Sequence, residues 1–289
     1  MSMGLRKAFR PFLKLSATCR MKDTETYHAL IIRLRAFFTQ KGFKEVPTQS
    51  RLSILAACEN PHSVATFMYN GEVWPLPQTG QMWLEYELLK NPEWPGVFCI
   101  STSYRDEKTP IPGRHEKIFP MFEFESHGGM KELEAMEAEL LAFLGFAAPV
   151  TMDYDETCKA YGDVPTLEDE HENRMWKEQG PIVSLQNFPE RTSPFWNMRR
   201  ADTGLYNKID VIMYGQETIG SAERSSNVEE MRRAFYTVSE GSYAAKLFEL
   251  FGKERVEAEL EEYLRFKFFP RFGGGIGLTR MARAWLLKV

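Results

Sequence analysis

Arginines beside aromatic residues mark the first segment of this sequence that could do chemistry. Tyr104-Arg105-Asp106-Glu107 is followed by a polar loop that holds Arg114 and His115, and then by Phe119. A guanidinium group binds two phosphate oxygens at once, and an aromatic face can stack on a base. We interpret the segment as a clasp for a nucleotide. An ordinary charged hairpin could contain the same residues, so this segment alone does not establish a nucleotide-binding site.

A glycine run near the C-terminus is the second such segment. Its glycines are Gly273, Gly274, Gly275 and Gly277, and Arg280 follows on the first turn of a predicted helix. Glycines at this density let a backbone approach a ligand closely. The run is neither GxGxxG nor a P-loop, because its spacing differs and no GK[ST] follows. A plain glycine-rich turn between a strand and a helix is the alternative.

Two carboxylates form the third candidate. Asp210 and Glu217 stand on two predicted strands joined at Gly215. At the far ends of neighbouring strand segments they could converge on one divalent ion, since Mg²⁺ favours a few carboxylates together with phosphate oxygens and water. A pair of solvated acids at strand ends is the simpler interpretation.

The hydrophobic pattern predicts the elements that must position these residues. A helix that Asp23 could cap carries an apolar stripe from Leu30 to Phe38 and ends at Gly42. Further helices are expected at 81–90, 130–144, 166–178, 228–235, 256–266 and from 278 onward. Strands are expected at 43–47, 97–104, 118–126, 181–185, 208–214 and 217–224. Because the strands mostly follow one another through loops and hairpins, the pattern predicts an α+β domain around an antiparallel sheet.

Composition narrows the class of protein. The 289 residues carry a net charge of −4, which is not the overall charge of an electrostatic nucleic-acid binder. No apolar stretch has the length of a membrane span, so no membrane partner is expected. The four cysteines are scattered and no HExxH occurs, which argues against a disulfide framework and a zinc site and favours a cytoplasmic location.

The first 22 residues differ from the rest, because they carry six basic residues and no acidic one. We interpret residues 1–22 as a basic N-terminal arm and residues 23–289 as the catalytic domain. An organelle-targeting peptide is the alternative for the arm.

Taken together and in order, the segments resemble the three signature motifs of class II aminoacyl-tRNA synthetases. Gly42–Pro47 is similar to motif 1, the segment from Tyr104 to Glu123 looks like motif 2, and the glycine run ending in Arg280 looks like motif 3. The resemblance implies a class II synthetase-like antiparallel β-sheet flanked by helices. It also implies ATP and Mg²⁺ as cofactors, an aminoacyl-adenylate intermediate, and a homodimer formed through motif 1.

Within that class the chain is most similar to the aspartyl and asparaginyl branch. Gln78-Thr79-Gly80-Gln81 resembles the branch's QSxQ segment, and the following Leu84-Glu85 has the asparaginyl form. Pro194–Met198 resembles its PFYM segment. Asp210, Glu217 and Arg224 match the branch's magnesium acids and the arginine that meets the substrate side chain.

The resemblance implies a role for each matching residue. Arg105 and Arg280 would be catalytic. The ATP-binding residues would be Arg105, Glu107, Arg114, His115, Phe119, Glu217 and Arg280. The residues that bind the amino acid would be Gln78, Gln81, Glu85, Glu123, Glu223 and Arg224. The metal ligands would be Asp210 and Glu217.

The sequence also departs from the branch. Glu223 stands where glutamine is usual, so we expect a charged Glu223 to neutralise Arg224 and alter the preferred side chain. Ile118 replaces the usual acidic or prolyl residue before Phe119. Because only about twenty residues precede the core, we expect no anticodon-binding barrel of the kind that the branch carries.

The sequence is therefore compatible with three functions. The first is activation of an aspartate- or asparagine-like amino acid and transfer to ammonia, as in stand-alone asparagine synthetases, or to another non-tRNA acceptor. The second is a truncated asparaginyl-tRNA synthetase-like enzyme that charges tRNA, which the short N-terminal segment disfavours. The third is a non-catalytic paralogue that binds a nucleotide or an amino acid for regulation.

Overall fold

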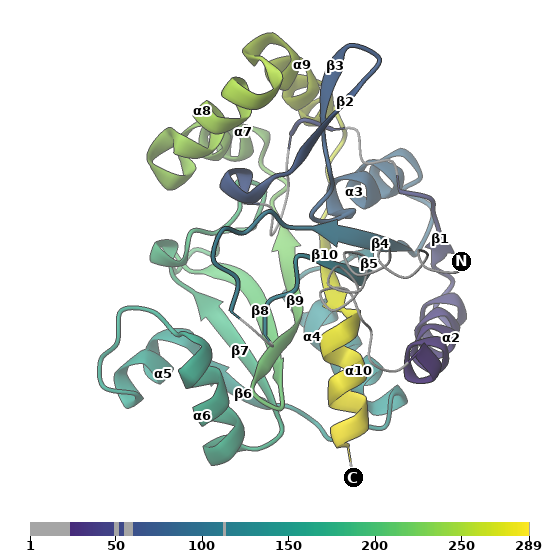
Figure 1. Cartoon of the computed structure of the whole chain (residues 1–289), viewed down its shortest axis with the longest axis vertical. Coiled ribbons are helices and arrows are strands. Elements are labelled where there is room, and N and C mark those ends of the chain that lie inside the picture. Colours follow the sequence, from purple (N-terminus) through teal and green to yellow (C-terminus); the bar gives the residue numbers. More distant parts are fainter. Residues whose placement is uncertain (1–23, 49–51, 55–59, 112–113, 289) are drawn as a thin grey trace, which may run out of the picture.

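One eight-stranded sheet forms the centre of the molecule (Figure 1). The computed structural model describes residues 24–48, 52–54, 60–111 and 114–288. In spatial order the strands are β1 (Lys44–Glu45), β4 (Gly96–Tyr104), β5 (Ile118–His127), β10 (Arg271–Gly277), β9 (Gln216–Arg224), β8 (Tyr206–Met213), β7 (Ile182–Phe188) and β6 (Val150–Asp153). The outermost pairs are parallel and the inner pairs are antiparallel. The predicted antiparallel α+β fold is confirmed.

The two faces of the sheet have opposite character, because successive residues of a strand point to opposite sides. On β5, Phe122 and Phe124 are fully buried in the main hydrophobic core. This core also takes up the apolar sides of α2 (Thr24–Gln40), α4 (Met130–Phe143) and α10 (Leu278–Leu287). Glu123 and Glu125, which alternate with the two phenylalanines, point to the other face. The sheet therefore presents a polar surface on the side away from α4.

The predicted stripe of the first helix is confirmed. Its five apolar residues are all buried: Leu30, Ile31, Leu34, Phe37 and Phe38. The Phe38 ring packs against Phe122 of β5, with 5.0 Å between the ring centroids, which fixes α2 on the sheet. Asp23 and the basic arm at 1–22 lie outside the described residues.

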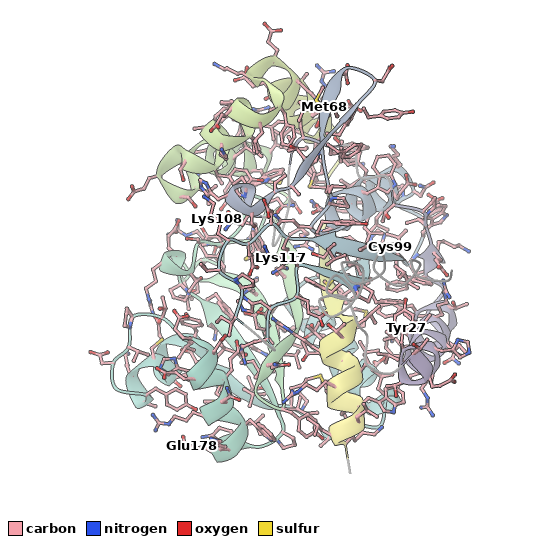
Figure 2. The ribbon with its side chains drawn as sticks, viewed as in Figure 1. Tyr27, Met68, Cys99, Lys108, Lys117 and Glu178 are labelled. Carbon is pink, nitrogen blue, oxygen red and sulfur yellow. The ribbon has the colours of Figure 1, made fainter. Side chains whose placement is uncertain are left out.

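Smaller layers cover the two ends of the sheet. The helices α7 (Val228–Thr237), α8 (Ser242–Phe251) and α9 (Lys253–Leu264) form a second core with α3 (Gln81–Lys90). Beside α9 a hairpin of β2 (Thr66–Tyr69) and β3 (Glu72–Pro75) projects, with Met68 exposed on it (Figure 2). At the other end, α5 (Tyr154–Ala160) and α6 (Asp169–Gln179) pack on β6 and β7.

Several predicted boundaries change. The expected strand at 43–47 contains only the two residues of β1, and the expected helix at 166–178 begins at Asp169. The pattern missed β2, β6, α5 and α8. The alternative of a glycine-rich turn is wrong, because the run is the strand β10, hydrogen-bonded between β5 and β9. Within the described ranges, no helix has the length and apolar character needed to cross a membrane.

Candidate active site

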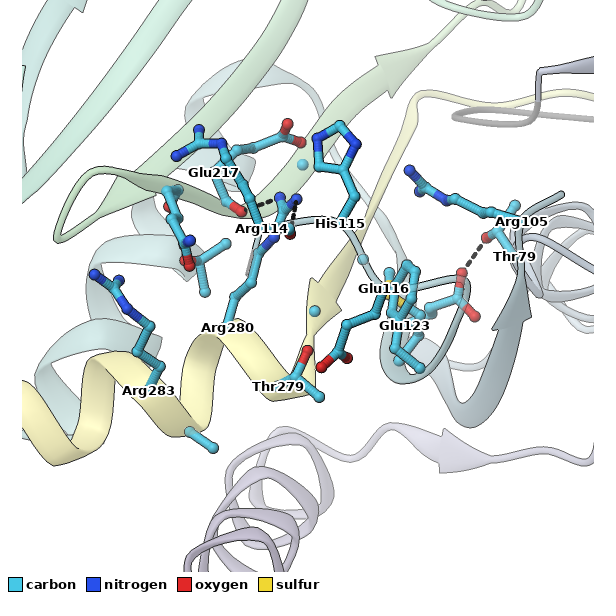
Figure 3. A pocket seen from close by; sticks show the side chains of 18 of the residues that line it. Thr79, Arg105, Arg114, His115, Glu116, Glu123, Glu217, Thr279, Arg280 and Arg283 are labelled. Atoms are coloured by element: carbon cyan, nitrogen blue, oxygen red, sulfur yellow. Dashed lines mark hydrogen bonds between the residues drawn. The ribbon is translucent and has the colours of Figure 1, made fainter. Parts of the chain in front are cut away.

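The polar face of the sheet forms the floor of a cavity of about 670 Å³ (Figure 3). Its walls come from the loop between β4 and β5, from α6 and from α10. Residues predicted from the sequence that line it are Gln78, Gln81, Arg105, Glu107, Arg114, His115, Phe119, Glu123, Glu217, Arg224 and Arg280. Glu85, Asp210 and Glu223 were predicted as well, but they are not among its lining residues.

Arg105 presents a positive charge to this cavity. It follows directly after β4, and its backbone N–H donates to the Lys117 carbonyl oxygen at 2.7 Å, which closes the base of the loop. The guanidinium carbon lies 5.3 Å from the centre of the Phe119 ring. Within the described ranges no carboxylate pairs with Arg105, and its buried Nε–H has no acceptor. A buried donor without a partner is costly, so this position favours an anion.

Arg280 closes the opposite wall from the first turn of α10. It donates to two backbone oxygens, that of Glu217 at 2.6 Å and that of Arg114 at 3.4 Å. Its positive charge is therefore oriented by neutral acceptors. Across the loop, His115 Nδ1 lies 3.0 Å from a Glu107 carboxylate oxygen, so these two predicted residues support one another.

The carboxylates of Asp210 and Glu217 both lie close to Gly220. A Cβ built on Gly220 would lie 3.0 Å from Glu217 Oε1 and 3.6 Å from Asp210 Oδ1, so the glycine leaves open the space between the acids. Burial raises the pKa of Asp210 to about 7, against the lowering effect of Lys208, whose Nζ lies 2.5 Å from Oδ2. Asp210 Oδ1 is buried and lacks a hydrogen-bond partner. An orphaned carboxylate oxygen beside a second acid fits a divalent cation that takes its remaining ligands from phosphate and water.

Glu123 lies at the other end of the cavity and is fully buried. Its carboxylate accepts from the Gly80 backbone N–H at 2.8 Å and from the hydroxyl groups of Thr79 and Ser101. Burial raises the pKa of Glu123, and these hydrogen bonds lower it. The carboxylate is thus a fixed acceptor in the floor.

The two predicted glutamines are both engaged. Gln81 Nε2 donates to the Gly274 carbonyl oxygen at 2.7 Å, and Gln81 Oε1 accepts from Arg224 at 2.6 Å. Gln78 bonds the backbone of Asn60 in both directions. Their amide groups therefore shape the floor as well as line it.

Arg224 belongs to a buried network of charges beneath the cavity. It lies 3.2 Å from Glu125, while Arg271 lies 2.6 Å from Glu85. Glu85 also accepts from Tyr263 at 2.5 Å and from the Asn197 amide at 2.7 Å, and it is completely buried. Glu85 thus supports the floor from below, and its Oε1 lies 3.7 Å from Nε of Arg224, which lines the cavity.

The glycines of β10 allow the neighbouring strands and side chains to pack closely at the floor of the cavity. A Cβ built on Gly274 would lie 2.7 Å from Ser221 Cβ and 3.0 Å from the Gly220 oxygen, so a side chain is excluded there by backbone and β-carbon. At Gly275 the nearest atom to such a Cβ would be Met121 Cε, at 2.8 Å on the cavity floor. Glycine is required at these positions by close packing and not by a positive φ.

The sequence places this geometry in a known family. The family model described as tRNA synthetases class II (D, K and N) matches residues 6–288. The chain belongs to this family. The class II resemblance is therefore confirmed, and the ligase chemistry of the family is consistent with amino-acid activation.

Solved structures of class II synthetases share the fold. Asparaginyl-tRNA synthetase from Pyrococcus horikoshii, complexed with asparaginyl-adenylate, superimposes with a TM-score of 0.76 at 17% identity, over 91% of this chain and 64% of that one. For the Entamoeba histolytica asparaginyl enzyme with the same adenylate, the values are 0.70, 18%, 91% and 63%. For the aspartyl enzyme of that organism they are 0.67, 18%, 90% and 54%. The chain spans less than two thirds of each structure. A search of the curated proteins finds no match.

The role that the sequence predicts for Glu223 differs from its position in the structure. It adjoins Arg224 on β9 and therefore points to the opposite face of the sheet. Glu223 accepts from the Asn207 amide at 2.6 Å, and Arg224 is neutralised by Glu125 instead. The expectation that Glu223 neutralises Arg224 is wrong.

Sequence reasoning missed Glu125, Arg271 and Tyr263 as members of the network. Glu125 had a visible signal, because it lies two residues after Glu123 on a predicted strand and so shares its face. Arg271 directly precedes the glycine run. Tyr263 carries no local signal, because only the packing of α9 brings it to Glu85.

Proposed function

We propose that this protein activates an aspartate- or asparagine-like amino acid with ATP, forming an aminoacyl-adenylate and releasing pyrophosphate. The observation that carries the proposal is Arg105, a guanidinium group without a carboxylate partner among the described residues, set against Phe119 in the cavity. Membership of the class II family supports the same chemistry. The complexes of two similar synthetases with asparaginyl-adenylate support this substrate class.

Both reactants are anions, so catalysis requires positioning and charge neutralisation. In our proposal Arg105 holds the α-phosphate and the attacking carboxylate together, which brings the nucleophilic oxygen in line with the departing pyrophosphate. The carboxylate is ionised at neutral pH and needs no general base. The adenine ring lies between Phe119 and Arg280, and Glu107 accepts from its amino group.

The outer phosphates lie towards Arg114, His115 and Arg280. Asp210 and Glu217 would hold Mg²⁺, which when bound supplies positive charge to the phosphates. The unpartnered Asp210 Oδ1 and the gap above Gly220 support this assignment.

The amino acid occupies the end of the cavity lined by Gln78, Gln81 and Glu123 in this proposal, and its side chain meets Arg224. Glu85 acts through Arg271 and Asn197 beneath the floor. Glu223 has no contact role, since it lies on the other face of the sheet.

For the acyl acceptor we propose ammonia first, or another non-tRNA nucleophile. Transfer to tRNA is the alternative that the family favours. We also propose a homodimer through the motif 1 region, α2 and β1, because α2 leaves Ile32 exposed on its outer side.

The test is pyrophosphate exchange with ATP, Mg²⁺ and a panel of single amino acids. We expect exchange with aspartate or asparagine and with few others. Absence of exchange with every amino acid, in a preparation that still binds ATP, would favour the non-catalytic paralogue. The acceptor is then read from the product formed with ammonium or with total tRNA, using the amino acid that exchanges.

A further inference from the structure

Arg114 is held by helix α6, unlike Arg105 and Arg280, the other two arginines predicted to bind ATP. Its Nη2 pairs with Glu172, its Nε lies 2.6 Å from an Asp169 oxygen, and its Nη1 donates to the Gly215 carbonyl oxygen at 2.9 Å. The side chain is only 10% exposed. All three nitrogen atoms of the guanidinium group therefore face protein atoms from α6 or from the β8–β9 turn.

The charges around the three arginines differ. Arg105 has no carboxylate partner in the described ranges, and Arg280 donates to neutral backbone oxygens. Arg114 differs from these two because it faces two carboxylates of α6, while Arg283 is the nearby positive charge that acts on it. In that arrangement the two carboxylates offset the attraction of Arg114 for a phosphate group.

Glu172 contacts the backbone of Glu217 as well as Arg114. The same Oε2 atom that pairs with Arg114 also accepts from the Glu217 backbone N–H at 2.9 Å. One carboxylate oxygen thus joins the β4–β5 loop, α6 and the strand that carries the acid of the predicted cation site. A change at Arg114 is transmitted directly to the backbone of Glu217.

The ion pair between Arg114 and Asp169 lacks a well-oriented hydrogen bond. Arg114 Nε–H has no hydrogen bond although the Asp169 oxygen lies within 2.6 Å, because the N–H does not point at it. The Asp169 side chain is 36% exposed at the first residue of α6, where solvent screens the pair. A better-oriented anion entering the cavity can therefore compete for Arg114.

We propose that Asp169 and Glu172 are positioning residues that hold Arg114 away from the phosphates until a nucleotide displaces them. Their oxygens contact the guanidinium nitrogens that a phosphate group would use, so binding a triphosphate exchanges one set of anions for another. This inference rests on the proposed function for its ligand, ATP. It adds two residues of α6 whose effect is on nucleotide affinity and not on the chemical step.

The test compares Asp169→Asn and Glu172→Gln with the unchanged protein. Both substitutions keep the size and the acceptor oxygen of the side chain while removing its charge. Titration calorimetry with ATP and Mg²⁺, without an amino acid, measures the affinity directly. We expect each variant to bind ATP about three- to tenfold more tightly, as expected for loss of a competing partner of a partly screened pair. In pyrophosphate exchange, the KM for ATP should fall by the same factor while kcat changes by less than about twofold.

Glu170→Gln is the matched control, because it removes the same charge from the same helix at a side chain that is 86% exposed. It should leave the affinity unchanged. A second readout is Trp176, which lines the cavity from α6 and packs against Tyr214 with 5.8 Å between ring centroids. Its fluorescence, taken as the difference from a Trp176→Phe variant, should change when ATP or inorganic tripolyphosphate binds.

Weaker ATP binding by both charge-neutral variants would overturn the inference, because it would mean that the acids pre-orient Arg114 for phosphate. Unchanged affinity in both would overturn it as well. Failure of the proposed function looks different: ATP binds and responds to the α6 variants, yet no amino acid supports exchange. Absence of triphosphate binding by the unchanged protein and by both variants would contradict both statements.

Discussion

The guanidinium group of Arg224, at the cavity floor, lies 3.2 Å from the carboxylate of Glu125, and both side chains are almost completely buried. Arg271 and Glu85 form a second pair beside them, so the network contains two positive and two negative groups when Glu125 is ionised. Burial raises the pKa of Glu125 to about 7, against the lowering effect of Arg224. The charge presented to a substrate side chain therefore depends on Glu125.

Replacing Glu125 with glutamine should shift the preference of the enzyme towards aspartate. Above pH 7, where Glu125 is ionised, the variant keeps two arginines against Glu85 and gains one unit of positive charge, which favours a carboxylate over an amide. We expect the ratio of kcat/KM for aspartate to that for asparagine to rise about tenfold, which corresponds to about 1.4 kcal/mol. Pyrophosphate exchange measures the ratio. Glu93→Gln, at an exposed loop position, is the control, and an unchanged ratio for Glu125→Gln would show that this network does not select the side chain.

Arg105→Ala should remove most of the exchange activity without loss of stability. Removing one preorganised donor to a transition-state anion costs about 10²–10³ in rate. Since Arg105 has no carboxylate partner in the described ranges, the melting temperature should stay near that of the parent. Lys108→Ala, an exposed change on the same loop, should keep full activity. A rate for Arg105→Ala within a factor of two of the parent would place the reaction elsewhere.

Arg280→Ala should cost rate as well, and it should also destabilise the protein slightly. Its guanidinium group donates to the Glu217 and Arg114 backbone oxygens, which lose their partner. A lost hydrogen bond to a charged group corresponds to about 1.5–3 kcal/mol. Chemical denaturation measures this, and equal stabilities of Arg105→Ala and Arg280→Ala would contradict the difference in their contacts.

Gly220→Ala should raise the Mg²⁺ concentration that exchange requires. The new methyl group would lie 3.0 Å from Glu217 Oε1 and 3.6 Å from Asp210 Oδ1, in the space between the proposed ligands. The half-saturating Mg²⁺ concentration at fixed ATP measures the effect, and we expect it to increase severalfold while the fold is kept. If Mg²⁺ dependence does not change, the two acids do not share an ion above Gly220.

Glu137 should make the stability of the protein fall as pH rises. This carboxyl group of α4 is fully buried and contacts the Ser221 hydroxyl at 2.6 Å, with Asp210 of β8 and Glu134 of its own helix as nearby acids. Burial raises its pKa to about 8 from an ordinary value of 4.5. The folded protein thus holds a proton that the unfolded chain loses, so the free energy of unfolding declines between pH 4.5 and 8.

Glu137→Gln should remove the contribution of Glu137 to that decline and leave those of Glu125 and Asp210, whose pKa values are also raised. Thermal unfolding at pH 5 and pH 9 should show similar melting temperatures for parent and variant at the lower pH and a more stable variant at the higher pH. Glu139→Gln, on the exposed side of the same helix, is the control. A parallel pH dependence in parent and Glu137→Gln would mean that Glu137 is ionised in the folded protein.

Several features of the site could be predicted from residue order alone. Arg105, Phe119 and Arg280 were found because strand ends, a returning strand and a helix start are local patterns, and the cavity brings all three together. The stripe from Leu30 to Phe38 was found for the same reason, since helical periodicity reports burial directly.

Other relationships required the tertiary structure. The interpretation of Glu223 as a partner of Arg224 followed their adjacency in the chain, but adjacent residues of a strand face opposite sides, and only the packed sheet shows which side holds Glu125. Likewise α6 is separated from Arg114 by more than fifty residues, so no local pattern announces that Asp169 and Glu172 reach it.

The sequence by itself determined the family, the antiparallel sheet and eleven of the residues that line the cavity, because these depend on motifs and on periodicity along the chain. Only the tertiary structure decided which of the three arginines is neutralised, which acids lie below the floor, and where Asp210 is left with an unpartnered oxygen. Charge balance is a property of groups gathered in space, and distant segments contribute to it as strongly as neighbours do.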